Sequence, residues 1–150
     1  DFGFVNLDVL SNVKATFVKE GEYRAILPLH HPLANAPYVT LEELVKEPFL
    51  VIEEGSLSKP LEAFRQKGLE PVVRLRVHDD YSIMSMVESG LGVSILPELV
   101  LLKTNYQIAI LPIKPTITRK MGLVMKEKNA LPIASKYFID FLFVHIDDLP

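Results

Sequence analysis

The chain has 150 residues, of which 49% are hydrophobic and 23% are charged, and it carries a net charge of −3 with no cysteine. This composition excludes a wholly disordered chain, a disulfide scaffold and any site built on cysteine thiolates. The negative net charge argues against a surface that holds duplex DNA by itself, and the lack of a long apolar run excludes a membrane-spanning helix.

Predicted strands and helices alternate along the chain. In chain order they are strands at 1–5 and 22–29, a helix after Thr40, a strand at 49–52, a helix after Ser56 or Ser58, a strand at 72–77, a helix after Asp79 or Asp80, strands at 92–96, 106–111 and 119–126, and a helix at 133–145. This alternation is typical of the α/β class with a largely parallel sheet. Because the chain begins with Asp1 in a predicted strand, we expect it to be a piece of a longer polypeptide.

Local signals mark where several helices begin and end. Thr40 and Glu43 have the spacing of a capping box, which predicts a helix of about two turns that stops near Pro48. Gly68 and Gly90 stand where helices end, as expected of residues that adopt the left-handed conformation. On the last helix, the spacing predicts a buried apolar face. The residues of that face are Tyr137, Phe138, Phe141 and Leu142.

None of the motifs that carry chemistry is complete. His30 and His31 are adjacent, so they do not chelate one ion easily, and no metal site is expected. Gly90-Leu91-Gly92 follows a helix and precedes a strand, which is the reverse of a dinucleotide-binding fingerprint. No serine lies in a nucleophile elbow, and acids at the start of a helix usually favour its dipole. We therefore predict no catalytic residue, no metal and no cofactor.

Small polar residues follow three predicted strands, at Asn6, at Gly55-Ser56 and at His78-Asp79. In open α/β sheets, ligands bind outside the carboxyl ends of strands, where helix N-termini offer main-chain N–H groups to anions. The pattern predicts a cleft for a small ligand, for example a carboxylate. Asp79 and Asp80 oppose an anion unless they turn away or pair with Arg74 or Arg76.

Four segments in this order resemble a known family. They are Leu29–Ala34 (LHHPLA), Thr40–Phe49 (TLEELVKEPF), Glu54–Ser56 (EGS) and Asp79–Val100 (DDYSIMSMVESGLGVSILPELV). Together they resemble the effector-binding, or substrate-binding, domain of LysR-type transcriptional regulators. The resemblance implies the fold of type 2 periplasmic binding proteins, in which two α/β lobes are joined by two crossing strands and a small effector binds between them.

The resemblance also implies a division of the chain. Residues 1–28 and 98–150 would form a first lobe that is incomplete at its N-terminus, and residues 32–95 a complete second lobe. The hinge would lie near 28–31 and 96–97, at Pro28, His31, Leu96 and Pro97. The ligand-binding residues implied by the resemblance are Asn6, Gly55, Ser56, Ser58, His78, Asp79 and Asp80.

The function implied is a cytoplasmic sensor. A small, anionic metabolite would bind in the inter-lobe cleft and control DNA binding through a winged helix-turn-helix upstream, which has no counterpart in this chain. The full-length protein would be a homodimer or homotetramer with no membrane partner. Two alternatives stay open: a solute-binding protein of a transport system with the same fold, and an enzyme on that fold, for which no acid–base pair is found.

Overall fold

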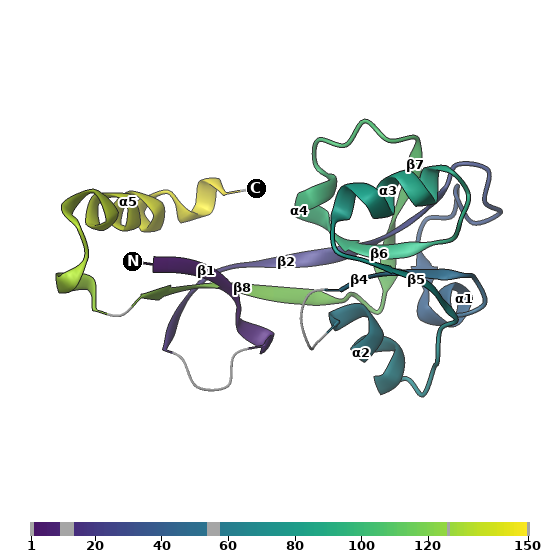
Figure 1. Ribbon diagram of the computed structural model, residues 1–150, viewed down its shortest axis with the longest axis horizontal. Coiled ribbons are helices and arrows are strands. Elements are labelled where there is room, and N and C mark those ends of the chain that lie inside the picture. The colour runs from purple at the N-terminus through teal and green to yellow at the C-terminus, as the bar shows by residue number, and fades with distance from the viewer. Residues whose placement is uncertain (1, 10–13, 54–57, 126, 150) are drawn as a thin grey trace. The chain divides into compact units, whose positions relative to one another are not determined.

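The computed structural model describes residues 2–9, 14–53, 58–125 and 127–149. The chain divides into two compact units (Figure 1). The first comprises Asp1–Gly21 with Thr118–Pro150, and the second comprises Glu22–Ile117. Strand β2 (Ala15–Pro28) contributes its beginning to the first unit and its end to the second. Among the described residues, no helix is long and apolar enough to cross a membrane.

The second unit contains most of the strands and helices. After the end of β2 come β3 (Val39–Thr40), α1 (Leu41–Leu44), β4 (Phe49–Ile52), α2 (Lys59–Gln66), β5 (Val73–Val77), α3 (Asp80–Glu88), β6 (Ser94–Pro97), α4 (Glu98–Leu101) and β7 (Ile108–Lys114). The strand predicted at 49–52 is confirmed. The strand predicted from residue 22 begins seven residues earlier, at Ala15.

Strand direction in this unit follows one rule with one exception. β6 and β7 flank β2 and both run antiparallel to it. β3 is parallel to β7, while β4 is parallel to β5 and, through the pair Phe49–Val93, to the chain entering β6. Strands β3 to β7 therefore share one direction and β2 opposes them. The expectation of a largely parallel sheet is therefore wrong, because β2 lies inside the larger sheet and pairs antiparallel with both β6 and β7. Among the described strands, parallel pairing is found between β3 and β7, between β4 and β5 and at the Phe49–Val93 bridge, and in the first unit β1 and β8 are antiparallel.

Alternate residues of the central strands supply two separate cores. Ala25, Phe49 and Ile95 pack with α1 and α2 on one face, whereas Ile26 and Leu50 pack with α3 and α4 on the other. The alternation is the period of two expected of a strand that is buried on both faces. The carboxyl ends of β4, β5 and β6, which run in the same direction, consequently lie at one edge of this layered unit.

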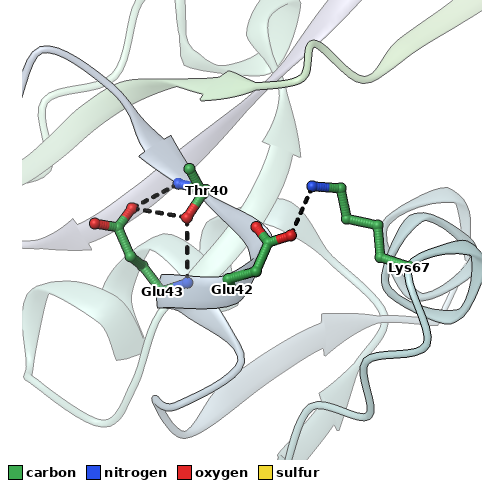
Figure 2. Close-up of polar contacts among 4 residues, drawn as sticks. All are labelled: Thr40, Glu42, Glu43 and Lys67. Carbon is green, nitrogen blue, oxygen red and sulfur yellow. Dashed lines mark hydrogen bonds and ion pairs between the residues drawn. The ribbon is translucent and has the colours of Figure 1, made fainter.

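The capping box predicted at Thr40 is present (Figure 2). The Thr40 hydroxyl accepts the Glu43 N–H at 3.3 Å, and the Glu43 carboxylate accepts the Thr40 N–H at 2.8 Å. Glu42, the residue before Glu43, forms an ion pair of 2.8 Å with Lys67 at the C-cap of α2, so the two short helices are joined on one side of the unit. The helix itself, Leu41–Leu44, has only one turn and is shorter than predicted, and residues 45–46 continue as a turn.

The first unit contains β1 (Phe2–Asn6), the start of β2, β8 (Thr118–Met125) and α5 (Ile133–Val144), with short 3-10 turns at Leu7–Val9, Lys128–Ala130 and Ile146–Asp148. β8 lies between β1 and β2 in the sheet. Figure 1 shows α5 in yellow as the last long element of the chain. Its predicted range of 133–145 is confirmed to within one residue.

Of the four residues predicted for the buried face of α5, Leu142 is confirmed as buried, and the rest of the face differs. Ile139 and Leu142 are buried, and Phe143 packs beside them, whereas Tyr137 and Phe141 are 73% and 63% exposed. The helix is apolar nearly all the way round, so spacing alone fits more than one face. Contact with the sheet decides between them and selects Ile139, Leu142 and Phe143.

Candidate functional site

A small hollow lies at the carboxyl ends of β4 and β6, within the second unit. The residues that line it are Tyr23, Phe49, Leu50, Val51, Ile52, Ser58, Lys59, Pro60, Ile95, Leu96 and Pro97. Its volume is about 20 Å³, which is room for one water molecule. A ligand of metabolite size would therefore place one of its groups in this hollow and extend outward from it.

The N-terminus of α2 forms one wall of the hollow. Ser58 is the N-cap residue, and its side chain makes no capping hydrogen bond, so capping does not engage the hydroxyl. Pro60 occupies the first turn, where a residue without an N–H is tolerated. Lys59 adds an ammonium group at the end of the helix where the dipole is already positive. This wall therefore favours a negatively charged group.

The opposite walls come from strands that are far apart in the sequence. Tyr23 on β2 stands opposite Pro97 on β6, and both are buried. Beside them, Arg24 contacts Glu98 at 2.9 Å and Glu22 at 3.1 Å, which balances its charge. No sequence motif marks Tyr23, Lys59 or Ile95 as a site residue. Lys59 could have been found from its place beside the predicted cap at Ser58, but Tyr23 and Ile95 depend on strand pairing.

The predicted ligand-binding residues of this unit lie at one edge of the sheet. Ser58 lines the hollow, and His78, Asp79 and Asp80 follow the carboxyl end of β5, the strand next to β4. The Glu53 N–H donates to the Val77 carbonyl at 2.8 Å, which holds the two strand ends together. The lining of the hollow includes none of residues 78–80. Gly55 and Ser56 lie outside the described residues.

Asp79 serves as a helix cap. Its carboxylate accepts the Ser82 N–H at 2.8 Å and the Ser82 hydroxyl at 2.6 Å, and these bonds lower the pKa of Asp79. Of the two acids proposed as caps, Asp79 is therefore the N-cap and Asp80 begins the helix. Arg74 does not pair with Asp79 but donates to the Leu91 carbonyl at 2.9 Å.

His78 and Asn6 make local contacts. The His78 ring lies 3.7 Å from the Glu53 carboxylate and is 81% exposed. Asn6 ends β1 in the first unit, where its side-chain oxygen accepts the Asp8 N–H at 3.0 Å. Among the described residues, no three potential metal ligands gather in one place. The binding role predicted for these residues stays a prediction.

The predicted hinge residues lie in or just after neighbouring strands. Pro28 ends β2, while Leu96 and Pro97 pair with Arg24 and Tyr23 of the same strand. His31 follows in a turn, where its Nδ1 accepts the Leu33 N–H at 3.1 Å and its Nε2 lies 3.3 Å from the Glu47 carboxylate. The two segments do not pair with each other, because Pro28 pairs with Ile108 on β7. Their hinge role, like the predicted lobe boundaries, stays a prediction.

Comparison with known proteins identifies the family to which this chain belongs. Residues 1–145 match the family model described as LysR substrate binding domain. The transcriptional activator CmpR of Synechocystis is 32% identical over 120 residues, which are 77% of this chain and 40% of CmpR. The chain thus spans about two fifths of the length of that relative.

Solved structures with the same fold include domains that hold small molecules. The regulatory domain of Synechocystis CcmR in complex with 2-PG has a TM-score of 0.84 at 21% identity, covering all of this chain and 75% of that one. The effector binding domain of QuiR in complex with shikimate has a TM-score of 0.81 at 20% identity, covering 99% and 72%. At this identity, the likeness establishes the fold, which is α/β of the periplasmic-binding-protein type.

Proposed function

Because the chain belongs to the LysR substrate binding domain family, we propose that it is the effector-sensing part of a transcriptional regulator. One observation supports a ligand site within this chain. It is the hollow at the carboxyl ends of β4 and β6, with Lys59 and the N-terminus of α2 on its wall. Relatives are named as transcriptional regulators, which favours regulation over solute transport or catalysis.

The proposed effector is a small molecule with a carboxylate or another compact anionic group. Lys59 and the positive end of α2 would receive that group, while Phe49, Val51 and Ile95 would contact the apolar part next to it. The uncommitted Ser58 hydroxyl would donate a hydrogen bond. The shikimate bound by QuiR carries such a carboxylate on a small ring. The rest of the ligand would contact the predicted first lobe, 1–28 with 98–150.

Regulation would follow from a population shift. An effector that binds the closed arrangement of the lobes more tightly than the open one moves the equilibrium by the difference between the two affinities. The hinge near 28–31 and 96–97 would carry that movement to winged helix-turn-helix domains elsewhere in a homodimer or homotetramer. Such a protein acts where the DNA is, so we place it in the cytoplasm.

The direct test of the anion site is a binding panel on the intact protein. Shikimate and benzoate are each compared with the corresponding uncharged methyl ester by thermal shift and calorimetry. We expect at least one acid to bind and its ester to bind about tenfold more weakly, as expected for loss of a charged hydrogen bond. If no acid binds, or if the esters bind equally well, the proposal of an anion site is wrong.

Two lysines on the same helix provide a matched pair for this test. Lys59→Met removes the ammonium at the first turn of α2, and Lys67→Met removes one at its C-cap, where Lys67 pairs with Glu42. Only the Lys59→Met variant should lose affinity for the acid. A regulatory readout completes the test: the acid should change promoter binding by the wild-type protein but not by the Lys59→Met variant.

A further inference from the structure

Strands β4 and β6 approach each other most closely where they begin. The Val93 N–H donates to the Pro48 carbonyl at 2.9 Å, and the Leu50 N–H donates to the Val93 carbonyl at 2.9 Å. These two bonds form the parallel bridge between Phe49 and Val93. Gly92 permits the approach, because a Cβ at that position would lie 2.3 Å from the Pro48 carbonyl oxygen.

The next bond of a parallel ladder would join the Ile95 N–H to the Leu50 carbonyl, since alternate residues direct their main-chain groups to the same neighbour. A side chain occupies that carbonyl instead. The Ser94 hydroxyl donates to the Leu50 oxygen at 2.7 Å. Among the residues that the structure describes, Ser94 is the one buried polar residue, with an exposure of 1%.

The hollow lies next to the end of this ladder. Phe49 and Leu50 line it, and so do the residues that follow on each strand, Val51 with Ile52 and Ile95 with Leu96. A ladder that continued past Leu50 would bring the two strands to the usual separation of about 4.8 Å and fill this space with main chain. The hollow therefore lies where the ladder between β4 and β6 stops. The ladder stops at the Leu50 carbonyl, where the Ser94 hydroxyl takes the place of the Ile95 N–H.

We infer that Ser94 is a positioning residue for the ligand site. Its hydroxyl satisfies the buried Leu50 carbonyl without drawing β6 onto β4, and so leaves the Ile95 N–H directed at the hollow as a donor for an acceptor on the ligand. The part of this inference that concerns the ligand rests on the proposed function. The part that concerns strand separation does not, because it is a property of the protein without ligand.

Hydrogen exchange tests strand separation without any ligand. In the intact wild-type protein and in Ser94→Ala, the exchange rate of the Ile95 amide is measured by mass spectrometry with residue-level fragmentation. In Ser94→Ala the Leu50 carbonyl needs a new donor, and the Ile95 N–H is the nearest main-chain candidate. We expect its exchange to slow by about tenfold, the effect of one additional hydrogen bond. Unchanged or faster exchange, which simple destabilisation produces, would overturn the inference.

A matched pair at the same position separates the hydroxyl from packing. Thr and Val have nearly the same shape, so Ser94→Thr keeps the donor and Ser94→Val removes it. The Thr variant should exchange like the wild type and the Val variant like Ser94→Ala. If the bulkier variants do not fold, the wild type and Ser94→Ala still decide the question.

Ligand binding provides the second readout, with shikimate as the probe. The affinity of Ser94→Ala should fall by about tenfold, while that of Ser94→Thr stays close to the wild type. Val87→Ala, a change in the core under α3 and away from the hollow, should lower stability without lowering affinity. Equal affinity of the wild type and Ser94→Ala would contradict the ligand part of the inference. If shikimate does not bind the wild type, the ligand part of the inference is wrong for this acid, and the exchange experiment still decides the strand-separation part.

Discussion

The carboxylate of Asp79 accepts two hydrogen bonds from a single residue, Ser82, through one oxygen from the main-chain N–H and through the other from the hydroxyl. Both bonds favour the ionised carboxylate, and the pKa of Asp79 consequently lies below its ordinary value of 3.8. They also satisfy an N–H in the first turn of α3, the helix that packs Ile83, Met84 and Val87 onto the sheet. The charge state of Asp79 is thereby coupled to the stability of this helix.

The first prediction concerns the pH dependence of that cap. A carboxyl with a lowered pKa in the folded state stabilises the protein above its unfolded pKa, and this contribution is lost as the pH falls through the folded value. Asn caps helices as well as Asp but does not ionise in this range. The difference in melting temperature between the wild type and Asp79→Asn should therefore shrink between pH 7 and pH 3.

Asp79→Ala is the control for this experiment, because it removes the cap at both pH values. It should melt below Asp79→Asn throughout, as measured by circular dichroism. A difference between the wild type and Asp79→Asn that is the same at pH 7 and at pH 3 would show that the ionised form has no special role in this cap.

The second prediction concerns the capping box at Thr40. Thr40→Ala removes the acceptor for the Glu43 N–H and the hydroxyl that donates to the Glu43 carboxylate at 2.9 Å. We expect the free energy of unfolding, measured with urea, to fall by about 1 kcal/mol. Thr40→Ser keeps both bonds and should lose less than half as much. Equal losses in the two variants would mean that the Thr40 methyl group, not its hydroxyl, stabilises α1.

Local signals predicted the elements well because the responsible interactions are themselves local. The capping box joins residues three apart, and the positive φ angles of Gly68 and Gly90 end α2 and α3 as predicted. The strand at Phe49–Ile52 is a short apolar run between turn residues. In each case the residues that interact are close in the sequence, so spacing and residue type were sufficient.

The site depends on contacts that spacing does not contain. Tyr23 and Ile95 meet at the hollow because β2 and β6 pair across about 70 residues of chain, a pairing that the sequence pattern of either strand leaves open. The sequence pattern assigns no role to Ser94, since no serine lies in a nucleophile elbow. Its role emerges from the neighbouring strand, where it bonds to Leu50. By contrast, the positions of Ser58 at a helix start and of residues 78–80 after a strand were predicted, because strand ends and helix starts are visible in the sequence. The binding role of these residues stays a prediction.

The third prediction concerns α5, whose buried face differed from the expected one. Ile139 is 1% exposed and packs in the core of the first unit, whereas Phe141 is 63% exposed. Ile139→Ala should lower the free energy of unfolding by about 2–4 kcal/mol, because it leaves a cavity. Phe141→Ala removes more atoms but should change it by less than about 1 kcal/mol, since those atoms are largely in solvent. Urea unfolding of the intact protein measures both, and the reverse order of the two losses would restore the face predicted from spacing.

The fourth prediction concerns Gly92, which lies where β4 and β6 are closest. A Cβ there would lie 2.3 Å from the Pro48 carbonyl oxygen, and that oxygen is held by the Val93 N–H at 2.9 Å. Relief would require main chain to move, so Gly92→Ala should lower the free energy of unfolding by about 3 kcal/mol. Gly21 on β2 is the matched control, because nothing lies within 4 Å of its Cβ position. Gly21→Ala should be neutral or slightly stabilising, as the unfolded chain loses conformational freedom. If the two variants unfold at the same urea concentration, the strands are not in contact at Gly92, and the separation beyond Leu50 has another origin.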